Sequence, residues 1–332
     1  MTHPGGLPVR IRPAAPADRE AVLELLAASL GWSVDDTFRA YLHWKHDRSP
    51  LGPSPAWVAV HDGAVVGYRA MLRWDLEGPG RRRIVAARAV DVATHPSVQG
   101  QGVFSALTAH AIESLRAAGV ELIFTTPNAK AGAGWVKAGA QLVGRLPTMV
   151  RPGSLRGLGR MLRAGGSAGR WPVPTAAGSS AAVTTNDPRL RTLLTSLAPA
   201  TGVRTYRTPE LLRWRYGYEP LGYRTIAVDD DPARGLAVFR LRRRGGATEA
   251  ALCEVLTPAD EPGAAARLRR SVAHASGADY VITLGSGRWV ERGGSVVVPG
   301  QGPTLYAMAL VPGLDVSGSH RWDLALGDVE LL

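Results

Sequence analysis

Residues 95–107 read HPSVQGQGVFSAL, and this stretch decides how the first half of the chain folds. It lies between a run typical of a strand, IVAARAVDVAT at 84–94, and a run with helical periodicity, FSALTAHAIESLRAAG at 104–119. Gly100 and Gly102 give the junction backbone freedom and remove Cβ atoms that would keep a ligand away. Because the first amides of a helix lack internal partners, the junction favours a phosphate site. By itself, it also fits a tight turn that binds nothing.

The surrounding elements alternate as in an α/β domain. The patterns predict helices at 16–30, 38–46, 104–119 and 133–139, and strands at 9–12, 56–60, 64–74, 84–94, 120–126 and 140–150. The tripeptide His61-Asp62-Gly63 indicates a hairpin between the second and third strands.

The second half of the chain repeats the first. LHWKHDRSPLG at 42–52 matches LRWRYGYEPLG at 212–222, and VDVATHP at 90–96 resembles CEVLTP at 253–258. SLRAAGVELIFT at 114–125 resembles VAHASGADYVIT at 272–283, in the same order. This pattern indicates a tandem duplication. We therefore predict a domain at 1–150, a Gly- and Arg-rich linker at 151–180 with a short helix at 154–163, and a second, degenerate domain at 181–332. The predicted class is α/β (α+β), with a twisted mixed sheet and helices on both faces in each domain.

Composition narrows the function classes. The chain has 332 residues and a net charge of +11, but its arginines are spread along the sequence without zinc-finger spacing or aromatic RNA-binding signatures. We expect no nucleic-acid partner and no bound metal. We also expect no membrane span and no secretory leader, because neither type of apolar segment is found. Cys253 is the only cysteine, so we expect a buried thiol and a cytoplasmic protein.

Two motifs carry a resemblance to a known family. Gln99-x-x-Gly102-x-Phe104 resembles motif A of the GCN5-related N-acetyltransferases, (Gln or Arg)-x-x-Gly-x-(Gly or Ala), although Phe104 replaces the usual small residue. TTPNAKAGAGWVKAGA at 125–140 resembles the second signature of that family, with Asn128 opening the helix and Trp135 at the aromatic position. The resemblance covers roughly residues 8–150.

The resemblance implies acetyl-CoA as co-substrate, bound where the strand ending at Thr94 parts from the strand at 120–126. It also implies that Asn128 binds the pantetheine arm, a role that does not exclude a plain helix N-cap. By the same resemblance, main-chain groups of Val92, Ala93 and Thr94 would bind the pantetheine like an added strand. The pyrophosphate would bind main-chain amides of Gln99, Gly100, Gln101, Gly102, Val103 and Phe104.

The proton-handling residues are less clearly marked. Asp91 lies on the central strand, where a half-buried carboxylate with a raised pKa would act as the base; the alternative is a structural pair with Arg88 or Arg69. Tyr68 is the second catalytic candidate if it faces the substrate gap, and otherwise it is a core residue. The family often has an acidic Tyr where this chain has Trp135, and an indole cannot replace it in proton transfer.

The second copy lacks the glycine loop. Its counterpart, TPADEPGAAAR at 257–267, places Asp260 and Glu261 where a pyrophosphate would lie, so we expect no CoA there. The predicted function is acetyl transfer from acetyl-CoA to the primary amine of a small molecule or amino sugar. The alternatives are a non-catalytic acyl-CoA sensor, and a related transferase of the aminoacyl or peptidoglycan type. Whether the protein is a homodimer stays open.

Overall fold

The computed structural model describes residues 6–261, 263–285, 290–291, 294–298 and 300–330, which form two compact units. Unit 1 comprises Met1–Leu76, Arg83–Gly144 and Thr304–Ser317, and unit 2 comprises Glu77–Arg82, Arg145–Pro303 and Gly318–Leu332. These units are not contiguous, so their limits do not coincide with the predicted boundaries at 150 and 181.

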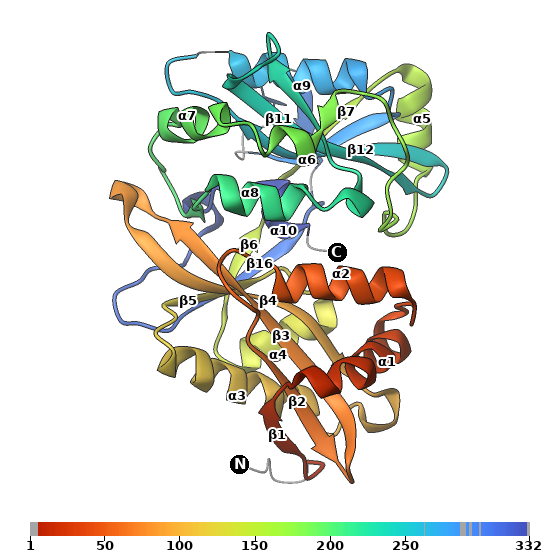
Figure 1. The fold of residues 1–332 in the computed structure, drawn as a ribbon, viewed down its shortest axis with the longest axis vertical. Helices are drawn as coiled ribbons and strands as arrows, with labels where there is room; N and C mark the ends of the chain where they lie inside the picture. The colour runs from red at the N-terminus through yellow and green to blue at the C-terminus, as the bar shows by residue number, and fades with distance from the viewer. Residues whose placement is uncertain (1–5, 262, 286–289, 292–293, 299, 331–332) are drawn as a thin grey trace. The chain divides into compact units, whose positions relative to one another are not determined.

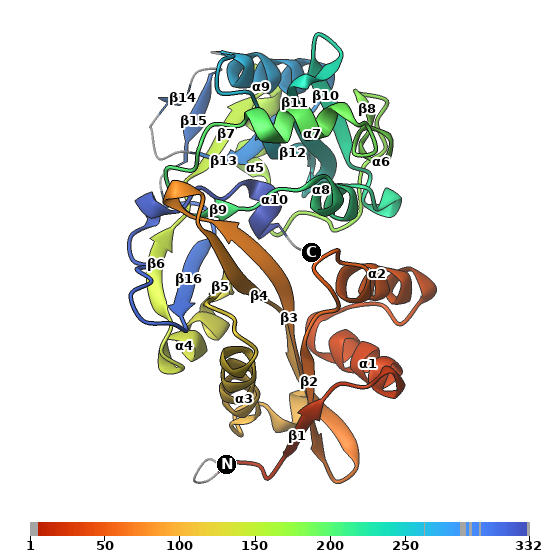
Figure 2. The ribbon, with the colours of Figure 1, turned by 60° about the vertical axis from the view of Figure 1, so that its left-hand side comes forward.

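Unit 1 is a mixed sheet with two helices on each face (Figures 1 and 2). The sheet order is β1-β2-β3-β4-β5-β16-β6. Its strands are β1 (Arg10–Pro13), β2 (Ala56–His61), β3 (Ala64–Glu77), β4 (Arg83–Thr94), β5 (Leu122–Thr125), β6 (Gln141–Arg145) and β16 (Thr304–Ala309). Its helices are α1 (Arg19–Leu30), α2 (Asp36–Asp47), α3 (Val103–Ala117) and α4 (Ala129–Lys137). In Figure 2, α1 and α2 lie on one side of β3 and β4, and α3 and α4 lie on the other.

Local sequence explains how α3 meets this sheet. Val103, Leu107 and Ala111 recur at helical spacing and are buried in the main core of the unit. Gly67 on β3 lets the helix approach closely, because a Cβ there would lie 2.7 Å from Val103 Cγ1. The predicted hairpin forms with Asp62 and Gly63 at positive φ, as a tight two-residue turn requires. These contacts fix the start of α3 against the sheet.

Unit 2 has a sheet of order β14-β15-β7-β13-β12-β11-β10-β8. Its strands are β7 (Thr148–Pro152), β8 (Ser179–Ser180), β10 (Arg224–Val228), β11 (Asp231–Arg244), β12 (Ala247–Leu256), β13 (Tyr280–Leu284), β14 (Val290–Glu291) and β15 (Ser295–Val297), and the short β9 (Arg204–Thr205) also lies in this unit. Its helices are α5 (Leu155–Arg163), α6 (Ala181–Thr184), α7 (Arg189–Ser196), α8 (Pro209–Tyr216), α9 (Ala264–Ala275) and α10 (Leu326–Val329). The predicted linker at 151–180 therefore contains α5, as expected, but also the end of β7 and all of β8.

Each unit takes the strand that follows its parallel pair in the sheet from the other half of the chain. In unit 1, β16 pairs with β5, with Tyr306 opposite Thr125 and Ala309 opposite Leu122. In unit 2, β7 pairs with β13 and β15, with Val150 opposite both Ile282 and Val296. The strand that completes each sheet thus comes from the other half of the sequence.

The two sheets share a detailed feature at their centres. In unit 1 the parallel pairing of β4 with β5 ends near a bond from Thr125 Oγ1 to the carbonyl of Ala89, at 3.2 Å. In unit 2 the parallel pairing of β12 with β13 ends near a bond from Thr283 Oγ1 to the carbonyl of Leu252, at 3.0 Å. The predicted mixed α/β class is confirmed, and this common detail supports the duplication.

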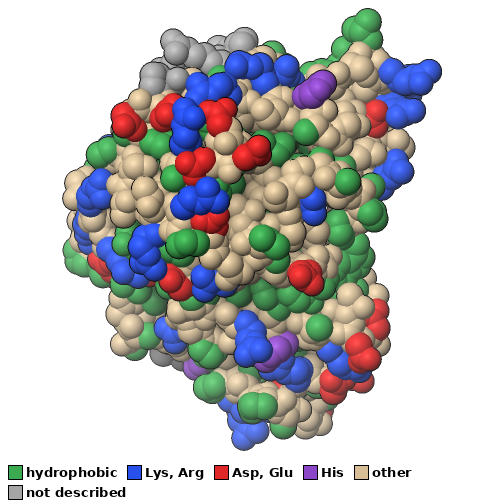
Figure 3. Space-filling view, turned by 45° about the horizontal axis from the view of Figure 1, so that its top comes forward, with side chains coloured by type: hydrophobic (Ala, Val, Ile, Leu, Met, Phe, Trp, Pro, Cys, Tyr) green, Lys and Arg blue, Asp and Glu red, His purple; other side chains and the backbone are tan. Residues whose placement is uncertain are grey.

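The charge of the chain is distributed broadly. Among the described residues on the face in Figure 3, basic side chains are spread over the surface with acidic ones between them. Within the described ranges, no helix is both long and apolar enough to cross a membrane.

Candidate functional site

The candidate site lies where β4 and β5 part. The two strands pair from Ala86 opposite Leu122 to Arg88 opposite Phe124, whereas β4 continues to Thr94. A hollow of about 450 Å³ opens beside the free end of β4. The hollow is lined by Ser29, Leu30, Val92, Ala93, Thr94, Val98, Gln99, Gly100, Gly102, Val103, Phe104, Ser105, Asn128, Lys130, Ala131 and Lys137. The structure thus brings together most of the predicted binding residues.

The glycine loop presents main-chain amides to this hollow. Gly100 and Gly102 have φ of 81° and 83°, a conformation that favours glycine, and Gly102 is the N-cap of α3. The amides of Gln99 and Gln101 each donate to a nearby carbonyl at 3.4 Å, so these two predicted contacts are already used. Within the described part of the chain, no acceptor is recorded for the amides of Gly100, Gly102, Val103, Phe104 and Ser105. A helix N-terminus with this many open amides suits an anion.

The end of β4 is less available than the sequence suggests. The carbonyl of Thr94 accepts from Ser29 Oγ at 3.0 Å and from Gln99 Nε2 at 3.3 Å. A carbonyl has two lone pairs, so that of Thr94 is satisfied and cannot also accept from a pantetheine amide. The predicted strand-like pairing is therefore restricted to the remaining main-chain groups of Val92, Ala93 and Thr94.

Asn128 is the N-cap of α4. Its side chain accepts from the amide of Ala131 at 2.9 Å, and it also lines the hollow. The structural role considered for this residue is therefore present, and its side-chain amide still has two donors for a ligand.

A buried guanidinium lies below the first turn of α3. Arg69 is 1% exposed, lies 4.7 Å from the Phe104 ring and 5.1 Å from the Trp135 ring, and donates to Thr108 Oγ1 at 2.8 Å. Burial lowers the pKa of Arg69 to about 9, which leaves it charged at neutral pH. The Phe104 ring occupies the space left by Gly134, where a Cβ would lie 2.4 Å from Phe104 Cε1. This packing explains why Phe104 replaces a small residue.

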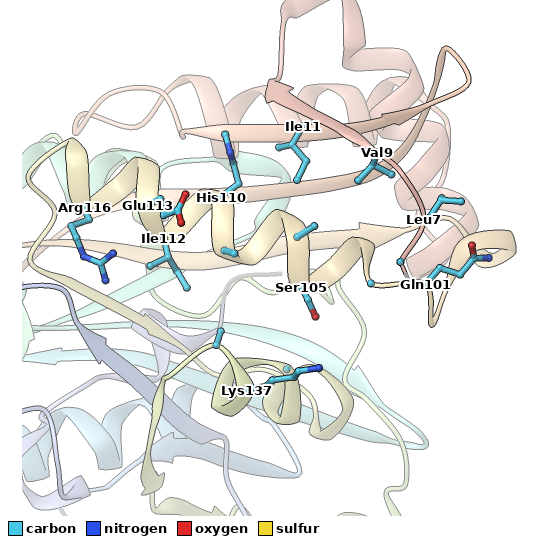
Figure 4. A pocket seen from close by; sticks show the side chains of 16 residues that line it. Leu7, Val9, Ile11, Gln101, Ser105, His110, Ile112, Glu113, Arg116 and Lys137 are labelled. Atoms are coloured by element: carbon cyan, nitrogen blue, oxygen red, sulfur yellow. The ribbon is translucent and has the colours of Figure 1, made fainter. Parts of the chain in front are cut away.

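Two lysines of α4 add positive charge at the same end of α3. Lys130 Nζ donates to Gln99 Oε1 at 3.3 Å, and Lys137 lines the hollow. A second hollow, of about 700 Å³, runs along the other side of α3 and shares Gly102, Ser105 and Lys137 with the first. In Figure 4, Ser105 points from α3 toward the side where Lys137 lies.

Asp91 does not have the environment that the sequence analysis predicted for a base. Its carboxylate bonds Lys45 Nζ at 2.8 Å and His46 Nε2 at 2.8 Å, both from the last turn of α2. Burial acts to raise the pKa of Asp91, but the Lys45 charge and the His46 bond outweigh it and hold the pKa below its usual range. A carboxylate in this state is a weak proton acceptor, and its partners are not Arg88 or Arg69.

Tyr68 is a buried residue of β3, 5% exposed. Burial and then the negative charge of Asp91 raise its pKa, so the phenol stays protonated at neutral pH. Among the residues that the structure describes, no hydrogen-bond partner is recorded for its hydroxyl. Neither Tyr68 nor Asp91 lines the hollow, so the structure does not bring these two candidates together with the loop.

The corresponding loop in unit 2 is closed. The first amide of α9, that of Ala264, donates to the carbonyl of Glu261 at 3.2 Å. The Glu261 carboxylate lies at the same turn, paired with Arg234 at 3.4 Å and Arg267 at 3.3 Å. This turn offers an anion fewer open amides, and the Glu261 carboxylate would compete with the anion for both arginines.

The gap at β12 of unit 2 is filled by the end of the chain. Arg215 Nη2 donates to the carbonyl of Gly327 at 3.1 Å, and Arg242 pairs with Glu330 at 2.6 Å. A Cβ on Gly327 would lie 1.9 Å from Tyr216 Oη and 3.2 Å from the carbonyl of Cys253. Residues 326–330 therefore cover the position that stays open beside β4 in unit 1.

Sequence reasoning missed the groups that reach the site from other elements. Ser29 and Lys130 line the hollow, and Lys45 bonds Asp91 together with its neighbour His46. One signal was available for the last pair, because the repeat places Arg215 and Tyr216 at the same positions, and Tyr216 Oη bonds Glu254 at 2.9 Å. In both units, a residue at the end of a helix is thus bonded to a carboxylate on the central strand: His46 to Asp91, and Tyr216 to Glu254.

Comparisons with known proteins agree with this geometry. Residues 10–134 match the family model of the acetyltransferase (GNAT) domain. A probable N-acyltransferase from Enterococcus faecalis V583 has a TM-score of 0.65 and 12% identity over 91% of this chain and 72% of its own. A GCN5-related N-acetyltransferase from Anabaena variabilis has a TM-score of 0.64 and 15% identity over 92% and 73%. Eis1 from Mycobacterium abscessus has a TM-score of 0.58 and 14% identity over 91% and 74%. A search of curated proteins found no match.

Proposed function

Because residues 10–134 match the family model of the acetyltransferase (GNAT) domain, we propose that this chain is an N-acetyltransferase that uses acetyl-CoA. The proposed acceptor is the primary amine of a small molecule or amino sugar. The observation that carries the proposal is the set of open amides at Gly100, Gly102, Val103, Phe104 and Ser105, which faces a hollow between separating strands.

The electrostatics of the loop support a diphosphate ligand. The dipole of α3, the Lys130 and Lys137 ammonium groups and the buried Arg69 guanidinium all place positive potential near Gly102. Asn128 and main-chain groups of Val92 and Ala93 would hold the arm that follows the diphosphate. Acetyl-CoA supplies the activated thioester for attack by the amine.

The protein must position two reactants and return a proton to the leaving thiolate. Holding the reactants together supplies up to about 7–11 kcal/mol of the barrier in well-oriented systems. Tyr68 stays the proposed acid, because its phenol is kept protonated. It is 5% exposed and does not line the hollow, so this role requires the thiolate to reach its hydroxyl from beyond the lining residues. Asp91 is proposed as a structural carboxylate and no longer as the base.

Unit 2 is proposed to lack cofactor binding, because its loop is closed and the end of the chain fills its gap. It would then contribute a second folded unit to the enzyme without a second reaction centre.

The test is release of free thiol from acetyl-CoA by the full chain, across a panel of small amines and amino sugars. Tyr68→Phe is expected to lower kcat by about a hundredfold while the Kd for acetyl-CoA stays unchanged, since it removes only a proton donor. Tyr206→Phe, at a position 36% exposed in unit 2, is the control and is expected to leave kcat unchanged.

Binding of acetyl-CoA without turnover on any amine would favour the sensor alternative, which the ion-paired state of Asp91 also fits. Absence of binding would exclude both functions.

A further inference from the structure

Asp91 has an unusual backbone as well as an unusual side-chain environment. Its φ is 31°, a region that costs a non-glycine residue about 1–3 kcal/mol. Four other described non-glycine residues have positive φ: Asp62, Arg81, Asp229 and Asp230. Those four lie in turns or in a short 3-10 segment, whereas Asp91 lies inside β4. The strain therefore sits just beyond the last pairing of β4 with β5.

The side chain of this strained residue is held at both ends of its carboxylate. Lys45 Nζ lies 2.9 Å from Oδ1, and His46 Nε2 lies 2.8 Å from Oδ2. Lys45 is fully buried, and His46 is 6% exposed. We call these three residues the Lys45–Asp91–His46 clamp.

The clamp is anchored to the fold beyond α2. His46 Nδ1 bonds Ser54 Oγ at 3.0 Å, and the amide of Ser54 donates to the carbonyl of His46 at 2.8 Å. The Lys45 ammonium lies 5.6 Å from the Tyr41 ring and 6.0 Å from the Trp32 ring. The partners of Asp91 therefore have little freedom to follow the strand if it relaxes.

Unit 2 shows the same connection without the strain. Glu254, the counterpart of Asp91, is longer by one methylene and reaches Tyr216, and its φ is not among the positive values recorded for the described residues. The gap at β12 is filled by residues 326–330. The strained backbone at Asp91 is thus found beside the open gap of unit 1. Glu254, beside the filled gap of unit 2, has no such strain.

We infer that the Lys45–Asp91–His46 clamp holds β4 in the strained conformation that keeps Val92, Ala93 and Thr94 at the wall of the acyl-CoA hollow. The three residues are positioning residues, which act through the backbone of β4. The inference deepens the proposed function and rests on it for the identity of the ligand.

Two double variants test the clamp and differ by a single Cβ atom. Lys45→Met/Asp91→Gly and Lys45→Met/Asp91→Ala both remove the two buried charges, but only glycine adopts positive φ without strain. The first readout needs no ligand. The glycine variant is expected to melt at the higher temperature, although glycine in a strand is ordinarily less stable than alanine. If the alanine variant melted at the higher temperature, the proposed strain at Asp91 would be excluded.

The second readout is the Kd for acetyl-CoA by calorimetry. The glycine variant is expected to bind about tenfold more tightly than the alanine variant, because it retains the wall of the hollow. Equal affinities would overturn the positioning role. Lys45→Met alone is expected to weaken binding at least about threefold, and unchanged affinity would also overturn it.

The two readouts distinguish failure of the clamp from failure of the proposed function. If the wild-type chain does not bind acetyl-CoA while the melting order is reversed as expected, the clamp stands as a strain device and the ligand assignment falls.

Discussion

Each unit has a buried carboxylate on its central strand. The pKa of each carboxylate depends on whether burial, which raises it, is outweighed by a positively charged partner. Asp91 and Glu254 occupy equivalent strand positions, yet their pKa values shift in opposite directions. Lys45 sits directly on Asp91, whereas the Arg207 that bonds Glu254 is shared with Asp328, whose own charge opposes ionisation of Glu254. Burial is thus outweighed at Asp91 and prevails at Glu254.

This difference predicts a pH effect on stability. Burial raises the pKa of Glu254 to about 7, from an ordinary value of 4.5. The stability from this residue is full below about pH 4.5 and is lost as pH rises through 7, by up to about 3 kcal/mol. Glu254→Gln should remove that loss, so the difference in free energy of unfolding between wild type and variant should change between pH 5 and 8 in urea titrations.

The control for this effect is Glu249→Gln on the same strand. Glu249 is buried too, but Arg242 and Arg244 outweigh burial and lower its pKa, so it stays ionised from pH 5 to 8. Its replacement should leave the pH slope in that range unaltered. Parallel slopes for wild type and Glu254→Gln would contradict the account.

The sequence predicted some of the site residues but not the contacts that they make. Gly100 and Gly102 were predicted because positive φ at a strand–helix junction is a local demand that glycine meets. The partners of Asp91 were missed because Lys45 and His46 lie 46 and 45 residues away, and only the packing of α2 brings them to β4. The satisfied carbonyl of Thr94 was missed for the same reason, since Ser29 comes from α1.

At the scale of elements, the strands and helices of unit 1 followed from periodicity and turn residues, but strand membership did not. The hydrophobic pattern of β7 fits either sheet, because pairing is set by contacts far apart in sequence. The strand beside β5 is β16, which lies far along the sequence. A domain that ends at residue 150, as predicted, would lack this strand.

The strand exchange predicts that residues 1–150 alone do not fold cooperatively, because the edge of β5 lacks β16. A chain that joins residue 146 to residue 303 through a short Asn-Gly turn, and ends at 317, should fold. The amide of Leu146 donates to the carbonyl of Pro303 at 2.9 Å, so the two ends already meet. Cooperative melting and dispersed amide NMR signals check both chains. A well-folded 1–150 fragment would contradict the strand assignment.

At the scale of the whole molecule, the two units have similar sheets with different centres, as the predicted duplication would produce. Unit 1 keeps open amides at α3 and a hollow beside β4, whereas unit 2 has a closed turn at α9 and a filled gap at β12. The sequence predicts a duplication, and it lacks the glycine loop in the second copy. It did not indicate that residues 326–330 fill the second gap, because that segment has no counterpart motif in the repeat.

The central claim is that the turn at 100–105 binds the diphosphate of acetyl-CoA, and calorimetric titration of the full chain tests it most directly. Wild type should bind acetyl-CoA, and Gly102→Asp should bind at least about a hundredfold more weakly, because it adds negative charge and strain at a φ of 83°. Gly119→Asp is the matched control, with a φ of 77° just beyond the other end of α3, and should bind like wild type. Absence of wild-type binding, or equal binding by Gly102→Asp, would contradict the account.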